Sequence, residues 1–406
     1  MVRIAIIFGK LISSISKLFH LGAGATWPGE IALSLSPSIL TSLSQSLNKG
    51  IILVVGTNGK STTSLMIAKI LESQGLTVVH NGSGANLLNG IVSALIQKSQ
   101  ADWGVFEVDE NSLPLALKYV KPKAIVILNL FRDQLDRYGE VDVIMEKWQK
   151  SIEKLSKGTR LIINADDPGV ALLGKSHKSV MYFGVNDKTK FLKTKEHATD
   201  STFCPNCGNR LAYEGVYYSH IGIWKCTKCG EKRPNPTVFS FPSALPGLYN
   251  QYNTLAAVAT AKALGIQKPD LSDFQPAFGR QEEFRVAGNK IKIFLSKNPA
   301  GFNESLRTVL EMGAKDILFV LNDRIPDGRD VSWIWDVDFE MLPKTIKTIV
   351  SGDRAYDLAL RMKYAGLETK LEPQLPKAII GKNLYILATY SAMLEVRKIL
   401  TGKKIL

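Results

Sequence analysis

The sequence predicts an α/β protein whose central domain is a doubly wound, mostly parallel sheet carrying a phosphate-binding loop. Two observations predict this fold class. Short apolar runs alternate with helical patterns in the first half of the chain, and the same alternation returns from about residue 290 onward. The stretch VVGTNGKSTT, residues 54–63, joins the first apolar run to a helical pattern, as a strand does where it meets a helix at a phosphate site. The second block has no such loop, so we expect a smaller Rossmann-like domain there.

Length, composition and charge fit a globular protein with an anionic partner. The 406 residues allow two or three domains, and 45% of them are hydrophobic. Fifty-one basic residues against 37 acidic ones give a net charge of +14. Such a surplus favours a nucleotide, a nucleic acid, an acidic metabolite or a membrane surface, and it does not choose among them.

The first segment, residues 1–46, is expected to be helical and amphipathic. Its opening, MVRIAIIFGKLISSISKLFH, has an apolar run of about five residues before Gly9 and Lys10. That run is too short for a signal-peptide core or a membrane span. We favour packing of this helix on the next domain, and the alternative is that it lies on a membrane surface.

The loop after the first apolar run has the residues that a phosphate group needs. Glycines let backbone N–H groups turn inward, Lys60 supplies a positive charge, and Ser61 offers a hydroxyl to a magnesium ion. The motif is a shortened form of the usual one, because Val54 stands where the first glycine would fall. A simple turn ahead of a helix is the alternative, which the apolar run before and the helical pattern after make less favourable.

The strands of the central domain are expected to place carboxylates at one edge of the sheet. The apolar runs are GIILVV (50–55), LTVVHN (76–81), WGVFEV (103–108), AIVILNL (124–130) and RLIINA (160–165). Glu107, Asp109 and Glu110 follow the third run, and FRDQLDRYGE and NADDP follow the fourth and fifth. Ligands bind beyond the carboxyl ends of parallel strands, so these acids can hold magnesium opposite Ser61. Any single acid there could instead cap a helix.

The four cysteines of the chain predict a zinc ribbon inserted at residues 200–235. Cys204, Cys207, Cys226 and Cys229 form the pattern C-x2-C-x18-C-x2-C, with a glycine after each pair. Disulfides are the alternative, but a cytosolic ATP-using chain would keep these thiols reduced. No cysteine is left over to act as a nucleophile.

The second block of apolar runs predicts the C-terminal domain. Its strands are expected in IKIFLS (291–296), DILFVLND (316–323), TIKTIVSGD (345–353) and NLYILATY (383–390). The segment FGRQEEFRVAGN joins the two blocks, which places the domains at residues 47–288 and 289–406. A site between two domains would allow closure over substrates.

Several motifs together resemble the Mur ligase family. GTNGKSTT, FEVDE, FRDQLDRYGE, NADDP, GLYNQYNTLAA and FGRQEEF are similar, in this order, to the central domain of Mur ligases. The ribbon, LSKNPAGFNESL (295–306) and DRIPDGRDVSWIWDVDFE (323–340) narrow the resemblance to the MurT ligase subunits of lipid II isoglutaminyl synthases.

The resemblance implies an ATP-dependent carbon–nitrogen ligase of cell-wall peptidoglycan synthesis. The γ-phosphate of ATP, with Mg²⁺, would activate the α-carboxylate of D-isoglutamate in the lipid II stem peptide, and ammonia would attack the acyl phosphate. A GatD-like glutaminase would supply the ammonia as the partner in a heterodimer. The expected location is the cytoplasm, with contact at the inner face of the membrane.

The resemblance also implies roles for single residues. Lys60 and Glu107 would act in the ligase reaction, with Ser61 and Glu107 on magnesium. Asp330 would complete the catalytic triad of the glutaminase partner. The residues that would contact ATP are Gly56, Thr57, Asn58, Gly59, Lys60, Ser61, Thr62, Asn164, Asn253 and Arg280.

Three positions depart from the pattern of the family. Asp133-Gln134 stands where relatives have Asp-His with a second magnesium, which puts that ion in doubt. Lys147 and Lys150 lie on either side of the position of a carbamylated lysine. LSKNPAG replaces the Asp-x-x-His-Asn run of amino-acid-adding relatives, as suits an amine without a carboxylate.

Two other functions remain open at the level of sequence. One is a Mur-type ligase that adds a whole amino acid. The other is a zinc-ribbon ATPase acting on nucleic acid, favoured by the positive charge and the ribbon. The outer part of the ribbon, GNRLAYEGVYYSHIGIWK, has aromatic residues but little basic clustering, so no nucleic-acid partner is expected.

Overall fold

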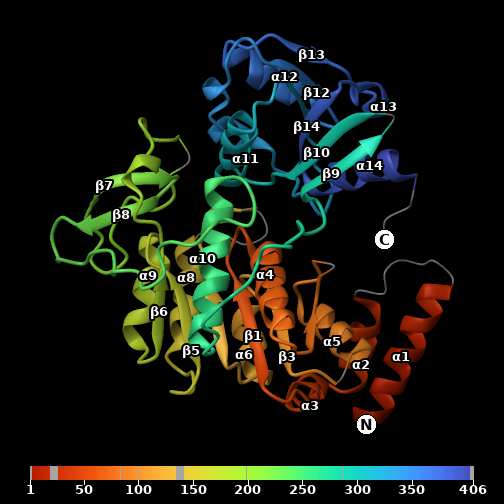
Figure 1. Cartoon of the computed structure of the whole chain (residues 1–406), viewed down its shortest axis with the longest axis vertical. Coiled ribbons are helices and arrows are strands. Elements are labelled where there is room, and N and C mark those ends of the chain that lie inside the picture. Colours follow the sequence, from red (N-terminus) through yellow and green to blue (C-terminus); the bar gives the residue numbers. More distant parts are fainter. Residues whose placement is uncertain are drawn as a thin grey trace.

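A computed structural model describes residues 2–18, 26–82, 84–98, 100–133, 141–197, 199–286 and 288–402. The central domain is built on a six-stranded sheet of order β2-β3-β1-β4-β5-β6, in which every pairing is parallel (Figure 1). Its strands are β1 (Gly50–Val55), β2 (Val78–His80), β3 (Trp103–Val108), β4 (Ala124–Ile127), β5 (Arg160–Asn164) and β6 (Val180–Phe183). Five of these match predicted runs, and β6 was not predicted.

Helices cover both faces of this sheet because alternate residues of its strands point to opposite sides. Ile52 and Val54 of β1 pack in the core beneath α4 (Lys60–Ser73) and α10 (Leu248–Ala263). Ile51 and Leu53 pack on the other side, which α5 (Leu88–Gln97), α6 (Leu113–Tyr119) and α8 (Val141–Ile152) cover. The short helices α9 (Pro168–Leu173), η1 (Gly174–Ser176) and η2 (Lys188–Lys190) follow β5 and β6. This arrangement confirms the predicted doubly wound fold.

In the described part of the chain, the first strand is preceded by the helices α1 (Val2–Leu18), α2 (Trp27–Leu35) and α3 (Ile39–Gln45). Ala5 of α1 is fully buried, and Gly9 lies close to Ile96 of α5 and to the carbonyl of Pro28. The helix therefore packs on the central domain by one face, as favoured from the sequence. No helix among the described residues is both long and apolar enough to cross a bilayer.

The C-terminal domain is a second sheet, of order β13-β12-β11-β14-β10-β9, in which only β9 runs antiparallel. Its strands are β9 (Arg280–Val286), β10 (Asn289–Leu295), β11 (Asp316–Val320), β12 (Lys347–Ser351), β13 (Thr369–Leu371) and β14 (Asn383–Ala388). Its helices are α11 (Pro299–Glu311), η3 (Ser332–Asp336), η4 (Phe339–Met341), α12 (Ala355–Tyr364), α13 (Leu375–Ala378) and α14 (Tyr390–Thr401). Because β9 pairs with β10 in a hairpin, the boundary predicted between residues 288 and 289 falls inside that hairpin, and the sheet of this domain includes residues from Arg280 onward.

The inserted segment forms an antiparallel hairpin of β7 (Leu211–Tyr218) and β8 (Ile221–Cys226), at the side of the central domain (Figure 1). The indole of Trp224 is buried and donates a hydrogen bond to the carbonyl of Ala165, 3.0 Å away. The fully buried Tyr217 donates to the carbonyl of Val185. The hairpin is thus fixed to the loops that follow β5 and β6.

Candidate functional site

The turn between β1 and α4 has the geometry of a phosphate loop. Gly56 and Gly59 have φ angles of +144° and +90°, which side chains rarely adopt. A Cβ atom on Gly59 would lie 2.1 Å from Oδ1 of Asn253, so glycine is required there. Asn253 also accepts a hydrogen bond from Thr63 at 3.2 Å. The structure therefore brings this predicted nucleotide-contacting residue against the loop.

Lys60, the first residue of α4, turns its ammonium back into the loop. Its Nζ donates to the carbonyls of Gly56 and Thr57, at 2.6 and 3.3 Å. It also forms an ion pair with Glu110 at 3.1 Å, and both side chains are buried. A buried cation with an acidic partner is held in place, because leaving either charge unpaired is costly.

Ser61, Glu107 and Arg280 meet beside Lys60. The hydroxyl of Ser61 donates to Glu107 Oε2 at 2.6 Å, and Arg280 Nη2 lies 3.4 Å from the same hydroxyl. Burial lowers the pKa of Arg280, and the carboxylate of Glu107 opposes that shift. A hydroxyl and a carboxylate at the edge of a phosphate site are the hard oxygen donors that Mg²⁺ takes together with phosphate oxygens. The donor set fits magnesium.

These residues line a cavity of about 360 Å³ between the two domains. The phosphate loop forms one wall, and residues of β10, α11 and α14 or their adjoining loops form the other. The lining includes Thr57, Asn58, Gly59, Lys60, Ser61, Thr62, Glu107, Asn253, Arg280, Lys297, Gly301, Glu304, Pro326 and Tyr390. Most of the residues predicted to contact ATP or magnesium therefore share one space.

Two of the contacts that join the domains beside this cavity were not predicted. The amides of Asn58 and Asn298 exchange hydrogen bonds of 3.2 and 3.0 Å. Lys297 forms an ion pair with the buried Asp133, which raises the pKa of Lys297. Asn298 also caps α11 by accepting from the N–H of Gly301 at 2.8 Å. The motif LSKNPAG was the available signal, because an Asn-Pro pair opens a helix there.

Some predicted positions lie elsewhere. Asn164 is fully buried and donates to the carbonyl of Leu128 at 2.9 Å, outside the residues that line the cavity. Lys147 and Lys150 are exposed on α8, while Trp148 between them points inward and donates to the carbonyl of Glu110 at 2.8 Å. Gln134 lies outside the described residues.

Glu304 is a buried acid of this cavity that the sequence did not single out. It pairs with Arg307, which also pairs with Glu196. Burial raises the pKa of Glu304 to about 7, although Arg307 opposes the shift. The carboxyl group can therefore gain or lose a proton near neutral pH.

Asp330 lies in the loop between β11 and η3. The loop is fixed by Asp327, which is buried and accepts from the N–H and the hydroxyl of Ser391 at the start of α14. Asp330 itself is exposed, and its Oδ1 accepts from the N–H of Ser332 at 2.8 Å. That bond lowers the pKa of Asp330, so the side chain is an accessible carboxylate on an anchored loop.

Exposed apolar side chains lie on and near α12, and we call this group the α12 surface. Tyr356, Leu360 and Tyr364 follow one another at spacings of four residues along the helix and are 68%, 49% and 72% exposed. Trp335 of η3 packs edge to face on Tyr364, with ring centroids 5.4 Å apart. A contiguous apolar surface of this kind is typical of a protein contact. Trp333, in contrast, packs on Phe302 in the core.

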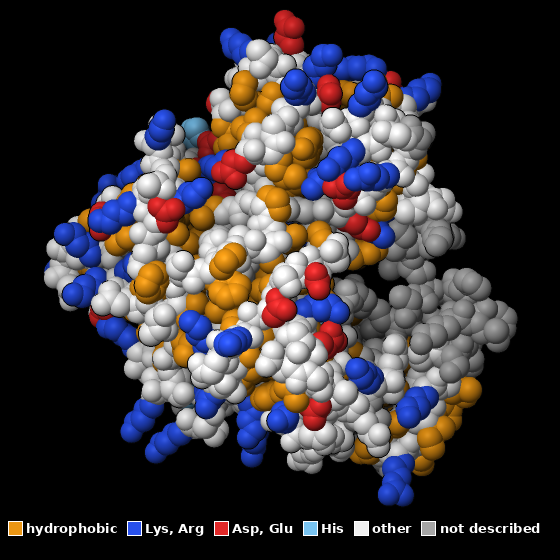
Figure 2. All heavy atoms as spheres, in the orientation of Figure 1, with side chains coloured by type: hydrophobic (Ala, Val, Ile, Leu, Met, Phe, Trp, Pro, Cys, Tyr) orange, Lys and Arg blue, Asp and Glu red, His pale blue; other side chains and the backbone are white. Residues whose placement is uncertain are grey.

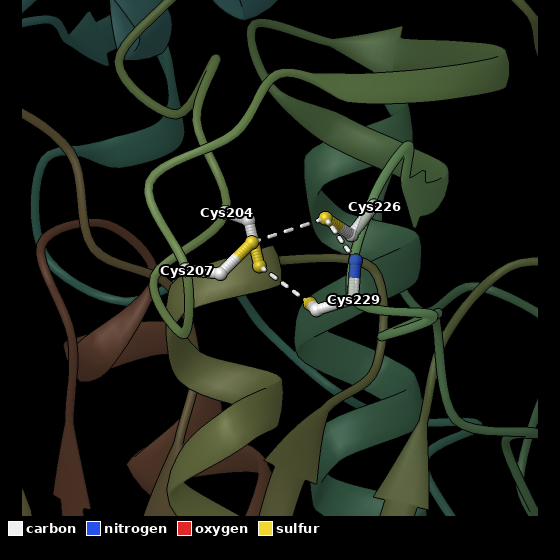
Figure 3. A group of neighbouring side chains, drawn as sticks. All are labelled: Cys204, Cys207, Cys226 and Cys229. Carbon is white, nitrogen blue, oxygen red and sulfur yellow. Dashed lines mark hydrogen bonds between the residues drawn. The ribbon is translucent and has the colours of Figure 1, made fainter.

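The four cysteines form the second site, beside the β7–β8 hairpin. Their sulfur atoms point toward one another from two loops (Figure 3) and all lie within 4.8 Å of one another. The Cys204–Cys229 and Cys207–Cys226 distances are 3.6 and 3.5 Å. A disulfide needs about 2.05 Å, whereas four thiolates about 2.3 Å from a zinc ion stand about 3.8 Å apart. The cluster fits a tetrahedral metal site.

Backbone groups support the cysteine cluster. The N–H groups of Lys228 and Cys229 both donate to the sulfur of Cys226 at 3.4 Å. These bonds lower the pKa of Cys226. They favour the thiolate form, which is the form that binds metal.

Two family models match the chain. The Mur ligase middle domain matches residues 54–261, and the MurT ligase C-terminal domain matches residues 295–393.

Relatives match over most of their length. A chain from Staphylococcus aureus (strain COL), named lipid II isoglutaminyl synthase (glutamine-hydrolyzing) subunit MurT, is 36% identical and covers 86% of this chain and 84% of its own. The subunit of the same name from Streptococcus pneumoniae is 34% identical, over 97% of this chain and 96% of its own. A pseudomurein peptide ligase type C from Methanothermus fervidus shares the fold, with a TM-score of 0.69 and 23% identity over 89% of this chain and 80% of its own.

Proposed function

Because the chain belongs to the MurT branch of the Mur ligase family, and is therefore a ligase, we propose that it amidates lipid II with ATP and ammonia. The group amidated is the α-carboxylate of D-isoglutamate in the stem peptide. The observation that carries this proposal is the cavity between the domains, where the phosphate loop, Glu107 and Arg280 face Lys297 and Glu304.

The chemistry divides into two transfers. A carboxylate oxygen of the substrate attacks the γ-phosphorus of ATP, the bond to ADP breaks, and an acyl phosphate forms. Ammonia then attacks the acyl carbon, and inorganic phosphate leaves with the carbon–oxygen electron pair. Lys60 and Arg280 offset the negative charge of the moving phosphoryl group. Mg²⁺, which members of this family use with ATP, would be held by Ser61 and Glu107 and would neutralise further phosphate charge.

The wall opposite the phosphate loop suits a small amine. It presents Lys297, which is paired with Asp133, and Glu304, which is paired with Arg307. Among the described lining residues of this wall, Lys297 thus already has an acidic partner. An incoming amino acid would need a cation to hold its carboxylate, and ammonia needs none.

A glutaminase subunit of the GatD type is the proposed source of ammonia, and its proposed contact is the C-terminal domain. The α12 surface offers the aromatic anchors that are common at protein interfaces. Asp330 is exposed on the anchored loop whose Pro326 lines the cavity. In that position its carboxylate would orient a histidine of the partner, which activates the partner's cysteine.

For the cysteine cluster we propose a structural zinc ion. Four thiol ligands leave no open coordination position, which is typical of structural sites. The metal would stabilise the hairpin whose Trp224 is bonded to the loop after β5. We further propose that the enzyme works in the cytoplasm at the membrane face, where a lipid-linked substrate is found.

The test measures ADP and amidated lipid II while the nitrogen source is changed. The chain is expected to use ammonium salt alone, and to use glutamine only with its glutaminase. Lys60→Ala should lower turnover by roughly 100-fold or more. Lys69→Ala, a change to an exposed lysine of the same helix, should have no effect. Turnover that depends on a free amino acid, or full activity of Lys60→Ala, would contradict the proposal.

A further inference from the structure

Helix α1 carries an apolar stripe on its outer side. Ile4, Ile7, Phe8 and Leu11 are 51%, 64%, 49% and 53% exposed, and their spacing places them on one face of the helix. The face that carries Ala5 and Gly9 is buried against α2 and α5. Figure 2 shows hydrophobic side chains along the outer edge of the molecule where α1 lies. The helix is thus already packed, and the stripe is a second apolar face that needs another partner.

The charged residues of α1 are all basic. Its 17 residues include three basic residues and no acidic one. Arg3 and Lys10 are exposed, and because they are seven residues apart they lie on the same flank of the stripe. Trp27, which is 73% exposed, precedes Pro28, whose carbonyl lies against Gly9. Apolar residues with basic neighbours and a tryptophan are the composition of helices that lie in a membrane interface.

We propose that α1 docks this chain on the anionic surface of a lipid bilayer, with the helix parallel to the membrane plane and Ile4, Ile7, Phe8 and Leu11 inserted among the lipids. The inference rests on the proposed function in one respect: the lipid-linked substrate would be found at that surface. The described part of α1 combines an apolar stripe with basic residues, as do helices that lie in the plane of a membrane surface. In Figure 1, α1 and α12 lie at opposite ends of the molecule, so docking leaves the α12 surface accessible to a partner subunit.

Charge also argues against a second copy of this chain as the occupant. In a two-fold contact the same residues face each other. The basic flank of the stripe would then lie near its own copy, and the described residues of α1 include no acid to offset it. An anionic bilayer offers an apolar interior to the stripe and attracts its basic flank.

The test measures sedimentation of the full 406-residue chain with vesicles of phosphatidylglycerol and phosphatidylcholine. Binding is expected with phosphatidylglycerol, and it should weaken in high salt and with phosphatidylcholine alone. Ile4→Glu/Phe8→Glu and, separately, Arg3→Glu/Lys10→Glu should each lower the partition coefficient about tenfold or more. The matched control is Tyr356→Glu/Leu360→Glu, which has the same spacing and similar exposure on α12. It should bind vesicles like the wild type.

A second readout separates docking from catalysis. The Ile4→Glu/Phe8→Glu variant should amidate detergent-solubilised lipid II at the wild-type rate and lipid II in vesicles more slowly. If solubilised lipid II is not amidated by the wild type, the proposed function fails, while the vesicle result still tests docking. Absence of wild-type binding to anionic vesicles, or equal binding by both α1 variants, would overturn the inference. One further result would overturn the inference. In it, light scattering shows that the wild type self-associates, and the α1 substitutions make the chain monomeric without changing its binding to vesicles.

Discussion

At the scale of single residues, two lysines of the ligase site have acidic partners inside the protein. Lys60 contacts two loop carbonyls and Glu110, and Lys297 contacts Asp133. A phosphate group of ATP in the loop would offer Lys60 a stronger partner than a carbonyl oxygen, because hydrogen bonds between ions are the strong ones. The loop thus holds its lysine in position for the nucleotide.

Replacing Asp330 tests the role proposed for it in the glutaminase reaction. Asp330→Asn is expected to leave ammonia-driven amidation nearly unchanged and to lower glutamine-driven amidation by roughly two to four orders of magnitude. The reason is that the amide keeps the shape of the side chain and loses the charge that stabilises an imidazolium. Asp336→Asn, at a half-exposed acid of the neighbouring η3, is the control. Equal loss with both nitrogen sources would place Asp330 in the ligase site or in the fold.

Replacing Glu304 tests how its burial affects stability. Its pKa is about 7 in the folded chain and near 4.5 when exposed, so folding takes up a proton between these values. Glu304 contributes fully to the free energy of unfolding below about pH 4.5. This contribution is lost as the pH rises through about 7, and the total loss is about 3 kcal/mol. Glu304→Gln should remove this pH dependence from the unfolding midpoints measured between pH 5 and 8. Glu311→Gln, exposed on the same helix, should keep it, and an unchanged slope in Glu304→Gln would contradict the assignment.

At the scale of elements, the inserted hairpin links the cysteine cluster to the central sheet. Arg233, just after β8, binds the buried Asp166 at 2.6 Å, and Tyr252 of α10 donates to the same carboxylate at 2.6 Å. One acid at the end of β5 therefore joins the hairpin to a helix that carries Asn253. Loosening the hairpin would affect folding before it affected the chemistry.

Elemental analysis and a cysteine variant test the zinc proposal. We expect one zinc ion per chain, and we expect Cys207→Ser to lower the unfolding temperature by several degrees, because metal binding here contributes to folding. Ammonia-driven turnover below that temperature should change less than about threefold. Lys228→Ala, in the same loop, serves as the control. Iron, no metal, or a variant that loses turnover but not stability would contradict a structural zinc.

Elements with a strong local signal could be predicted from the sequence, and those that depend on neighbours could not. The strands β1, β3, β4, β5, β11 and β14 are built on largely continuous, buried apolar runs. In contrast, RQEEFRV has the composition of a polar linker. It forms β9 at the edge of the sheet, where it pairs with β10 on one side only. The short strands β6 and β13 were also missed, and both lie at the edge of a sheet.

The candidate site shows the same limit. The phosphate loop and the four cysteines are local motifs, so the sequence identified them. The Asn58–Asn298 pair joins residues 240 positions apart, and no local sequence pattern predicts such a contact. Asn164 was assigned to the nucleotide from its motif, and its amide bonds to the backbone of the neighbouring loop.

At the scale of the whole molecule, polar contacts join the two domains around the cavity. The Asn58–Asn298 amide pair and the Lys297–Asp133 ion pair both connect the central domain with the segment before α11. Polar contacts of this kind are easier to exchange than an apolar interface, which suits domains that open and close over substrates.

A double-variant cycle tests the Lys297–Asp133 contact. Lys297→Met leaves Asp133 buried without its cation, and should destabilise the chain by roughly 1–3 kcal/mol, since Lys297 is partly exposed. Asp133→Leu in the same chain should recover most of that loss, because the unpaired charge is gone. Denaturant unfolding of the single and double variants measures both values. Additive losses would show that the two side chains do not interact.

An oxygen label can show whether one site joins phosphoryl transfer to amide formation. Lipid II labelled with ¹⁸O in the α-carboxylate is incubated with the chain, ATP, Mg²⁺ and ammonium, and the phosphate released is analysed by mass spectrometry. If the carboxylate is activated as an acyl phosphate, each phosphate released with amidated product carries one labelled oxygen, and Lys60→Ala releases almost none. Unlabelled phosphate formed together with amidated lipid II would rule out an acyl phosphate intermediate.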